Sequence, residues 1–108
     1  TVLSGDDGLT VPFMSVGVKG VVTVVSNYSP REITLMTRHA RANDFRKAGM
    51  MHRKFYPAFK AFFIESNPTP MKAALAKAGR ISSDEVRLPL SNLSAANRKI
   101  LFDTLATY

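Results

Sequence analysis

Two short apolar runs near the start of the chain are separated by turn residues and polar positions. The first, Thr1-Val2-Leu3, stops at Ser4, Gly5 and two aspartates, and the second is GVVTVV, residues 20–25. Continuous apolarity with many β-branched residues predicts strands that are buried on both faces, as in a parallel sheet. About a dozen residues between the runs suffice for a helical crossover, so the pattern predicts a β-α-β unit.

The crossover itself predicts a short helix. Asp6 or Asp7 is a suitable N-cap for it, because a carboxylate can accept from the first free N–H groups. Pro12 fits only within the first turn or so. The helix should extend through Val16 and end at Gly17.

Capping signals mark the starts of two further helices. SPRE, residues 29–32, is a capping-box sequence with serine as the N-cap and proline at the first helical position, which predicts a helix to about Ala42. Its apolar face comprises Ile33, Met36 and Ala40. Asp44 should cap a longer helix, in which Pro57 should cause a kink or a local break. The apolar stripe of this helix comprises Phe45, Ala48, His52, Phe55, Phe59 and Phe62.

The C-terminal part predicts two more helices. ESNPTP, residues 65–70, cannot be helical throughout because a residue before proline avoids the α region. Thr69 should cap the next helix, with Pro70 at its first position and Gly79 at its end. The buried face of that helix should comprise Met71, Ala74, Leu75 and Ala78. An extended loop should follow over residues 81–94, and a final helix should run from about Ser94 to Leu105.

Composition adds the constraints of a soluble globular protein with an excess of basic residues. The chain is 45% hydrophobic, carries a formal net charge of +7 and has no cysteine. The basic residues are scattered, and no RNA-binding, zinc-finger or basic-tail motif accompanies them, so we expect no nucleic-acid partner. No apolar run approaches the ~20 residues that span a bilayer, and no signal peptide is recognisable. We therefore expect no membrane partner and a cytoplasmic location, with which the lack of disulfides is compatible.

The SGDD sequence at the end of the first run is a candidate binding site. In barrels of alternating strands and helices, catalytic groups lie at the C-terminal ends of the strands. Glycine there lets backbone approach a ligand closely, and the next helix presents free N–H groups that suit an anion. The alternative is a tight turn with an ordinary aspartate cap, and the residues alone favour this simpler interpretation.

Four sequences that occur in order, LSGDD, KGVVTVVSNYSPRE, FIESNPTPMKAAL and VRLPLSNLS, resemble the C-terminal part of the dihydrodipicolinate synthase family. These are pyruvate-dependent, class I aldolase-type enzymes with a (β/α)8 TIM barrel. The resemblance implies an α/β fold in which residues 1–43 supply the last two barrel strands with their helices. Residues 44–108 would form a C-terminal helical domain, a three-helix extension. A complete barrel takes ~250 residues, so the remaining N-terminal part of the barrel is an expected partner.

The resemblance also implies a lyase activity. Family members condense pyruvate with aspartate semialdehyde through a Schiff base on a strand lysine, in lysine (diaminopimelate) biosynthesis, and assemble as homo-oligomers, typically tetramers. The lysine, its proton relay and the acceptor-binding arginine belong to the part of the family that this chain does not match. Lys19 precedes its predicted strand, and the other lysines lie in helical sequence. We therefore expect no catalytic residue, no metal and no cofactor in this chain, which alone should be inactive.

The substrate contacts that the resemblance implies are few. The backbone of Gly5 and the backbone carbonyl of Val22 should lie against the pyruvate carboxylate or its adduct. Asp6 and Asp7 should lie near the mouth of the site, and Asn67 should lie close to the C-terminal face of the barrel.

Other interpretations remain open at this point. The chain could be a non-catalytic truncated relative that acts as an interaction module, or part of a pyruvate aldolase with another aldehyde acceptor. His52 interrupts an apolar stripe, but no metal-ligand partner lies one turn away, so we interpret it as a half-buried helix histidine.

Overall fold

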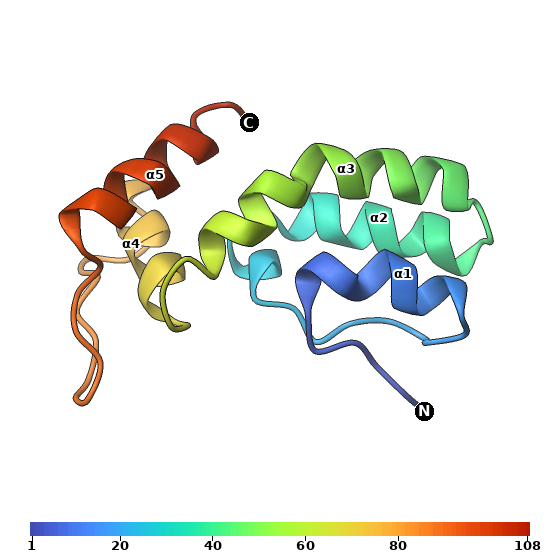
Figure 1. Cartoon of the computed structure of the whole chain (residues 1–108), viewed down its shortest axis with the longest axis horizontal. Helices are drawn as coiled ribbons and strands as arrows, with labels where there is room; N and C mark the ends of the chain where they lie inside the picture. Colours follow the sequence, from blue (N-terminus) through green and yellow to red (C-terminus); the bar gives the residue numbers. More distant parts are fainter. The chain divides into compact units, whose positions relative to one another are not determined.

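A computed structural model describes residues 1–108, which form two compact units, Thr1–Phe59 and Lys60–Tyr108. The helical elements, drawn in Figure 1, are in order η1 (Asp7–Leu9), α1 (Thr10–Ser15), η2 (Val25–Asn27), α2 (Pro30–Arg41), α3 (Phe45–Phe62), α4 (Thr69–Lys77) and α5 (Ala95–Leu105). The division between the units falls within α3. The predicted domains, residues 1–43 and 44–108, meet instead at the turn between α2 and α3, and this assignment stays a prediction.

The two apolar runs near the start pair with each other at one point. A single parallel bridge joins Ser4 and Val21. The N–H of Ser4 donates to the carbonyl of Gly20, and the N–H of Val22 donates to the carbonyl of Ser4, both at 2.8 Å. These slanted bonds are those of a parallel ladder, so the two segments run in the same direction, as the β-α-β pattern predicts.

The extent of the predicted strands is wrong for this chain. Residues 1–3 and 20–25 form no strand beyond the one bridge, and residues from Val25 onward turn into η2. Val2 and Val22 are 68% and 69% exposed, so the expected burial on both faces is also absent. The physical reason is that each segment has only the other as a neighbour, whereas a stable sheet needs three or more strands or a covering layer.

Helix α1 packs beside α2 in the first unit, as Figure 1 shows. Asp6 is the N-cap of η1, where its Oδ1 accepts from the N–H of Leu9 at 3.1 Å, and α1 continues directly from η1. The expected helix therefore begins with a 3₁₀ turn. Gly17 follows α1 with φ +108°, a conformation that suits glycine. The apolar side chains buried between these elements are Val11, Met14, Val25, Ile33, Met36 and Ala40, which confirms the predicted face of α2.

The predicted caps of α2 and α3 differ in outcome. Ser29 is the N-cap of α2 and Pro30 its first residue, but the Ser29 side chain accepts no capping hydrogen bond, so the predicted capping box is not formed. Asp44 does cap α3, because its Oδ1 accepts from the N–H of Lys47 at 3.0 Å. Helix α3 continues through Pro57 without a break.

The second unit confirms most of the predicted pattern. Helix α4 begins at Thr69 with Pro68 as the N-cap, one residue before the predicted start, and Gly79 follows its end with φ +70°. Ala78 is exposed because the helix ends at Lys77, so its predicted burial is wrong. The buried apolar residues of α4 are Pro70, Met71, Ala73 and Ala74, whereas Leu75, which is also predicted on the buried face, is only half-buried.

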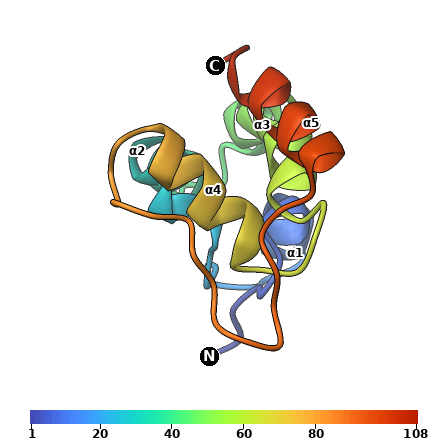
Figure 2. The same ribbon diagram turned by 90° about the vertical axis from the view of Figure 1, so that its left-hand side faces the viewer.

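The loop between α4 and α5 leaves the helices and returns, as Figures 1 and 2 show. Its extended course confirms the prediction. Arg98 of α5 holds Asp84 of the loop at 2.7 Å, and Ser94 caps α5 by accepting from the N–H of Asn97 at 3.2 Å. None of the helices combines the length and apolar character needed to cross a bilayer.

Candidate functional site

The carboxyl ends of the two extended segments form the centre of the candidate site. Because the segments are parallel and Ser4 pairs with Val21, Gly5 and Val22 both lie just beyond the bridge, at the same end. The structure therefore brings together the two residues whose backbones are expected to contact pyruvate. The N–H of Val22 is used in the pairing, which fixes its backbone beside the first segment.

Gly5 faces open space. A Cβ atom built at Gly5 would meet no heavy atom within 4 Å, and the residue does not adopt a positive φ. Packing and backbone conformation within this chain therefore impose no need for glycine at position 5.

Asp6 is held by its backbone and turns its carboxylate outward. The hydroxyls of Ser4 and Thr10 both donate to the carbonyl of Asp6 at 2.8 Å, and the N–H of Asp6 donates to Ser4 Oγ at 3.1 Å. Ser4 and Thr10 are buried, whereas Asp6 is exposed. The capping bond to Leu9 occupies only one of its carboxylate oxygens, so Asp6 can still contact a ligand from solution.

Asp7 points the other way, into the protein. Its residue is only 2% exposed. The Thr23 hydroxyl donates to Asp7 Oδ1, while the N–H groups of Val24 and Val25 donate to Oδ2 at 3.0 and 3.4 Å. Both carboxylate oxygens are thus occupied by groups of the second segment. The expectation that Asp7 contributes to the mouth of a substrate site has no direct test here and stays a prediction.

Asn67 belongs to the second unit and is exposed in the turn before α4. The same turn is tied to α5 through Glu65, whose Oε2 accepts from the N–H of Ser94 at 3.0 Å and from Nδ2 of Asn97 at 3.1 Å. These bonds lower the pKa of Glu65, and the bond from the N–H of Ser94 has the largest effect. The turn that carries Asn67 is thereby anchored, and a role for Asn67 in substrate binding stays a prediction.

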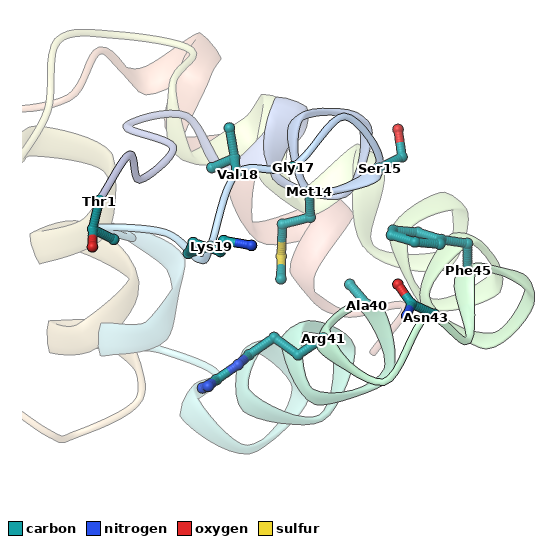
Figure 3. A pocket seen from close by; sticks show the side chains of 10 residues that line it. All are labelled: Thr1, Met14, Ser15, Gly17, Val18, Lys19, Ala40, Arg41, Asn43 and Phe45. Carbon is teal, nitrogen blue, oxygen red and sulfur yellow. The ribbon is translucent and has the colours of Figure 1, made fainter.

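A hollow of the first unit lies at the opposite end of the extended segments. Its volume is about 550 Å³, and Figure 3 shows Met14 reaching into it from α1. Thr1 and Lys19, which begin the segments, line it, and none of the predicted site residues does. Lys19 therefore lies away from Gly5 and Val22, as the sequence predicts. No group of three or more His, Cys, Asp and Glu side chains is arranged to hold a metal ion.

His52 is a half-buried helix residue, as predicted. Its ring lies 5.5 Å from that of Tyr56 and 6.0 Å from that of Phe59, measured between centroids. Its Nδ1 is buried and has no hydrogen-bond partner. Burial, followed by the positive charge of Arg53, lowers the pKa of His52, so the ring remains neutral at pH 7.

Sequence reasoning misses Thr23, and it includes Ser4 in SGDD without a role for its hydroxyl. The Ser4 hydroxyl donates to the carbonyl of Asp6 within its own loop, and the Thr23 hydroxyl donates to Asp7 and so connects the two segments. A usable signal exists for Thr23, because it is the one hydroxyl residue within GVVTVV and a buried hydroxyl needs a partner.

Comparisons with known proteins agree on one family. The profile of the Dihydrodipicolinate synthetase family matches residues 1–107. The 4-hydroxy-tetrahydrodipicolinate synthase of Methanocaldococcus jannaschii is 48% identical over 97% of this chain and 36% of its own length.

Solved structures agree with the sequence comparison. The crystal structure of dihydrodipicolinate synthase from Aquifex aeolicus is 44% identical and superimposes on the whole chain with a TM-score of 0.97, over 36% of its own length. The chloride-inhibited synthase from Acinetobacter baumannii, complexed with pyruvate, is 33% identical over 98% of this chain and 36% of its own, with a TM-score of 0.92. The chain thus spans little more than a third of the length of the relatives that it matches.

Proposed function

Because the chain belongs to the dihydrodipicolinate synthetase family and corresponds to the C-terminal part of its longer members, we propose that it works as that part of a Schiff-base-forming lyase. The reaction is the condensation of pyruvate with aspartate semialdehyde. In this proposal the extended segments become the seventh and eighth strands of a TIM barrel when the preceding part of the barrel flanks them. The assembled enzyme is a homo-oligomer.

The observation that supports this proposal best is the placement of Gly5 beside Val22. The two backbones lie together at the carboxyl ends of parallel segments, the end of a barrel where ligands bind. Nothing in this chain needs glycine at position 5, so a ligand that approaches the backbone accounts for the missing side chain. The pyruvate complex of the Acinetobacter baumannii relative makes pyruvate the appropriate ligand.

The chemistry requires a lysine that this chain does not provide. A Schiff-base lysine is activated by desolvation or by a neighbouring cation. Lys19 is exposed at the opposite end of the segments, and the other lysines all lie in helices. We therefore assign the Schiff-base lysine to the preceding part of the barrel. The backbones of Gly5 and Val22 are assigned contacts with the pyruvate moiety.

Reductive trapping tests the proposal. The 108-residue chain and a longer protein that carries it behind the preceding barrel segments are each incubated with pyruvate and borohydride, and their masses are measured. We expect one pyruvyl adduct per subunit of the longer protein and none on the chain alone. A stoichiometric adduct on the chain alone would contradict the assignment of the lysine, and no adduct on the longer protein would overturn the proposed function.

A further inference from the structure

Asp7 forms a second connection between the segments that carry Gly5 and Val22. The first connection is the backbone bridge between Ser4 and Val21. Beyond it, the Asp7 carboxylate accepts three hydrogen bonds from residues 23–25. The backbones of Gly5 and Val22 lie between these two connections, so their separation is set on both sides.

The Asp7 carboxylate is built into the protein rather than presented to a ligand. Asp7 is 2% exposed, and the three groups that donate hydrogen bonds to its carboxylate are uncharged. A buried charge of this kind is costly unless hydrogen bonds replace its hydration, and bonds to an ionised acceptor are stronger than neutral ones. The three donors fulfil that requirement.

Thr23 extends the connection into the next turn. Its hydroxyl donates to Asp7 Oδ1, and its Oγ1 accepts from the N–H of Ser26 at 3.1 Å. Val24 and Val25, the other donors to Asp7, lie at the start of η2. Asp7 and Thr23 therefore fix the point at which the chain leaves the second segment, directly after Val22.

We infer that Asp7, supported by Thr23, is a positioning residue that holds the backbones of Gly5 and Val22 at the spacing required for pyruvate. This inference rests on the proposed function and replaces a direct contact between Asp7 and substrate. Asp6, with its outward carboxylate, keeps the direct role.

The pyruvate KM of Asp7 variants, measured in the longer enzyme, distinguishes a positioning role of Asp7 from a direct contact with substrate. Asp7→Ala removes all three acceptor bonds, and we expect the KM for pyruvate to rise about tenfold, because a small misplacement of contacting groups is costly. Asp7→Asn keeps one oxygen that can accept from the N–H groups of Val24 and Val25, and its amide NH2 can donate to Thr23 Oγ1 where the carboxylate accepted from that hydroxyl, so it should restore the pyruvate KM to within about twofold. If the charge of Asp7 contacted substrate, Asn would be as damaging as Ala, and that result would overturn the inference.

Thr23 provides an independent pair of variants. Thr23→Val should raise the pyruvate KM several-fold and Thr23→Ser should not, because only the hydroxyl is needed. Asp103→Ala, which removes an exposed carboxylate of α5, is the matched control and should be silent. A wild-type pyruvate KM in well-folded Asp7→Ala or Thr23→Val would also overturn the inference.

Hydrogen exchange keeps the test informative if the proposed function fails. In that case the unsubstituted longer protein forms no pyruvate adduct, and the connection is judged by amide protection of residues 23–27. We expect faster exchange there in Asp7→Ala than in Asp103→Ala. Equal protection in the two variants would show that Asp7 does not hold the second segment.

Discussion

Substitutions at Gly5 and Val22 should have different effects on pyruvate turnover, although the backbones of the two residues lie side by side. A side chain at Gly5 would project into space that is open in this chain and that pyruvate occupies in the proposal. We expect Gly5→Val in the longer enzyme to fold normally but to lose most pyruvate turnover. Steady-state kinetics with a thermal melt would measure both effects.

Val22→Ile is the matched control for Gly5→Val. The proposed contact is the main-chain oxygen of Val22, and an added methylene leaves that oxygen in place. We expect nearly unchanged kinetics, with up to ~1–3 kcal/mol of overpacking in the melt if neighbouring strands crowd the side chain. Normal pyruvate kinetics in a folded Gly5→Val enzyme would show that Gly5 is only a turn residue.

His52 makes stability depend on pH in a predictable direction. Burial lowers its pKa below the ordinary value of 6.5 in the folded state, so the unfolded chain takes up a proton first as the pH falls. The free energy of unfolding should therefore decrease as the pH drops through about 6.5 towards the lowered folded pKa. His52→Phe, which suits the neighbouring Tyr56 and Phe59 rings, should reduce this dependence.

Melting temperatures at pH 7.5 and 5.5 would test the role of His52. Wild-type protein should lose more stability between the two values than His52→Phe does. The carboxylates with lowered pKa, Asp44 and Glu65, titrate below this window, so they do not mask the difference. Equal losses in the two proteins would contradict the prediction.

At the level of elements, the sequence predicts helices far better than strands. Helix signals are local: Asp44 and Ser94 cap helices from three residues away, and the 3.6-residue period of Ile33, Met36 and Ala40 marks a buried face. The predicted strands depend on neighbours that are not in this chain, so only one bridge forms. The site shows the same limit, because the positions of Gly5 and Val22 follow from the parallel pattern, whereas the inward turn of Asp7 depends on long-range bonds to Thr23 and Val24.

Gly79 provides a test of helix termination. It follows α4 with φ +70°, where an L side chain costs roughly 1–2 kcal/mol. Gly79→Ala should lower the free energy of unfolding of the second unit by about 1 kcal/mol, and Gly79→Asn by less. Gly5→Ala is the control, because Gly5 has no positive φ, and chemical denaturation would measure all three. Equal losses at the two glycines would show that backbone conformation is not the cause.

For the molecule as a whole, the 108-residue chain exposes apolar surface along unpaired segment edges. Val2, Leu3 and Val22 are 68%, 49% and 69% exposed, and the backbone around them has few partners outside the single bridge. Such edges pair readily with other chains. We therefore expect the isolated chain to associate at micromolar concentration and to show no sharp monomeric boundary in sedimentation velocity.

A charge placed on the edge should weaken this association. Val2→Lys should shift the isolated chain towards monomer, because lysine on an edge strand opposes pairing. Leu88→Lys makes the same change in charge at a 92% exposed loop position of the second unit, outside the two segments in sequence, so it should leave the distribution unchanged. If Leu88→Lys is as effective as Val2→Lys, net charge rather than the edge controls association. If the unsubstituted chain sediments as a monomer and melts cooperatively, its edges are not adhesive, and the two extended segments do not require the flanking strands that a barrel would provide.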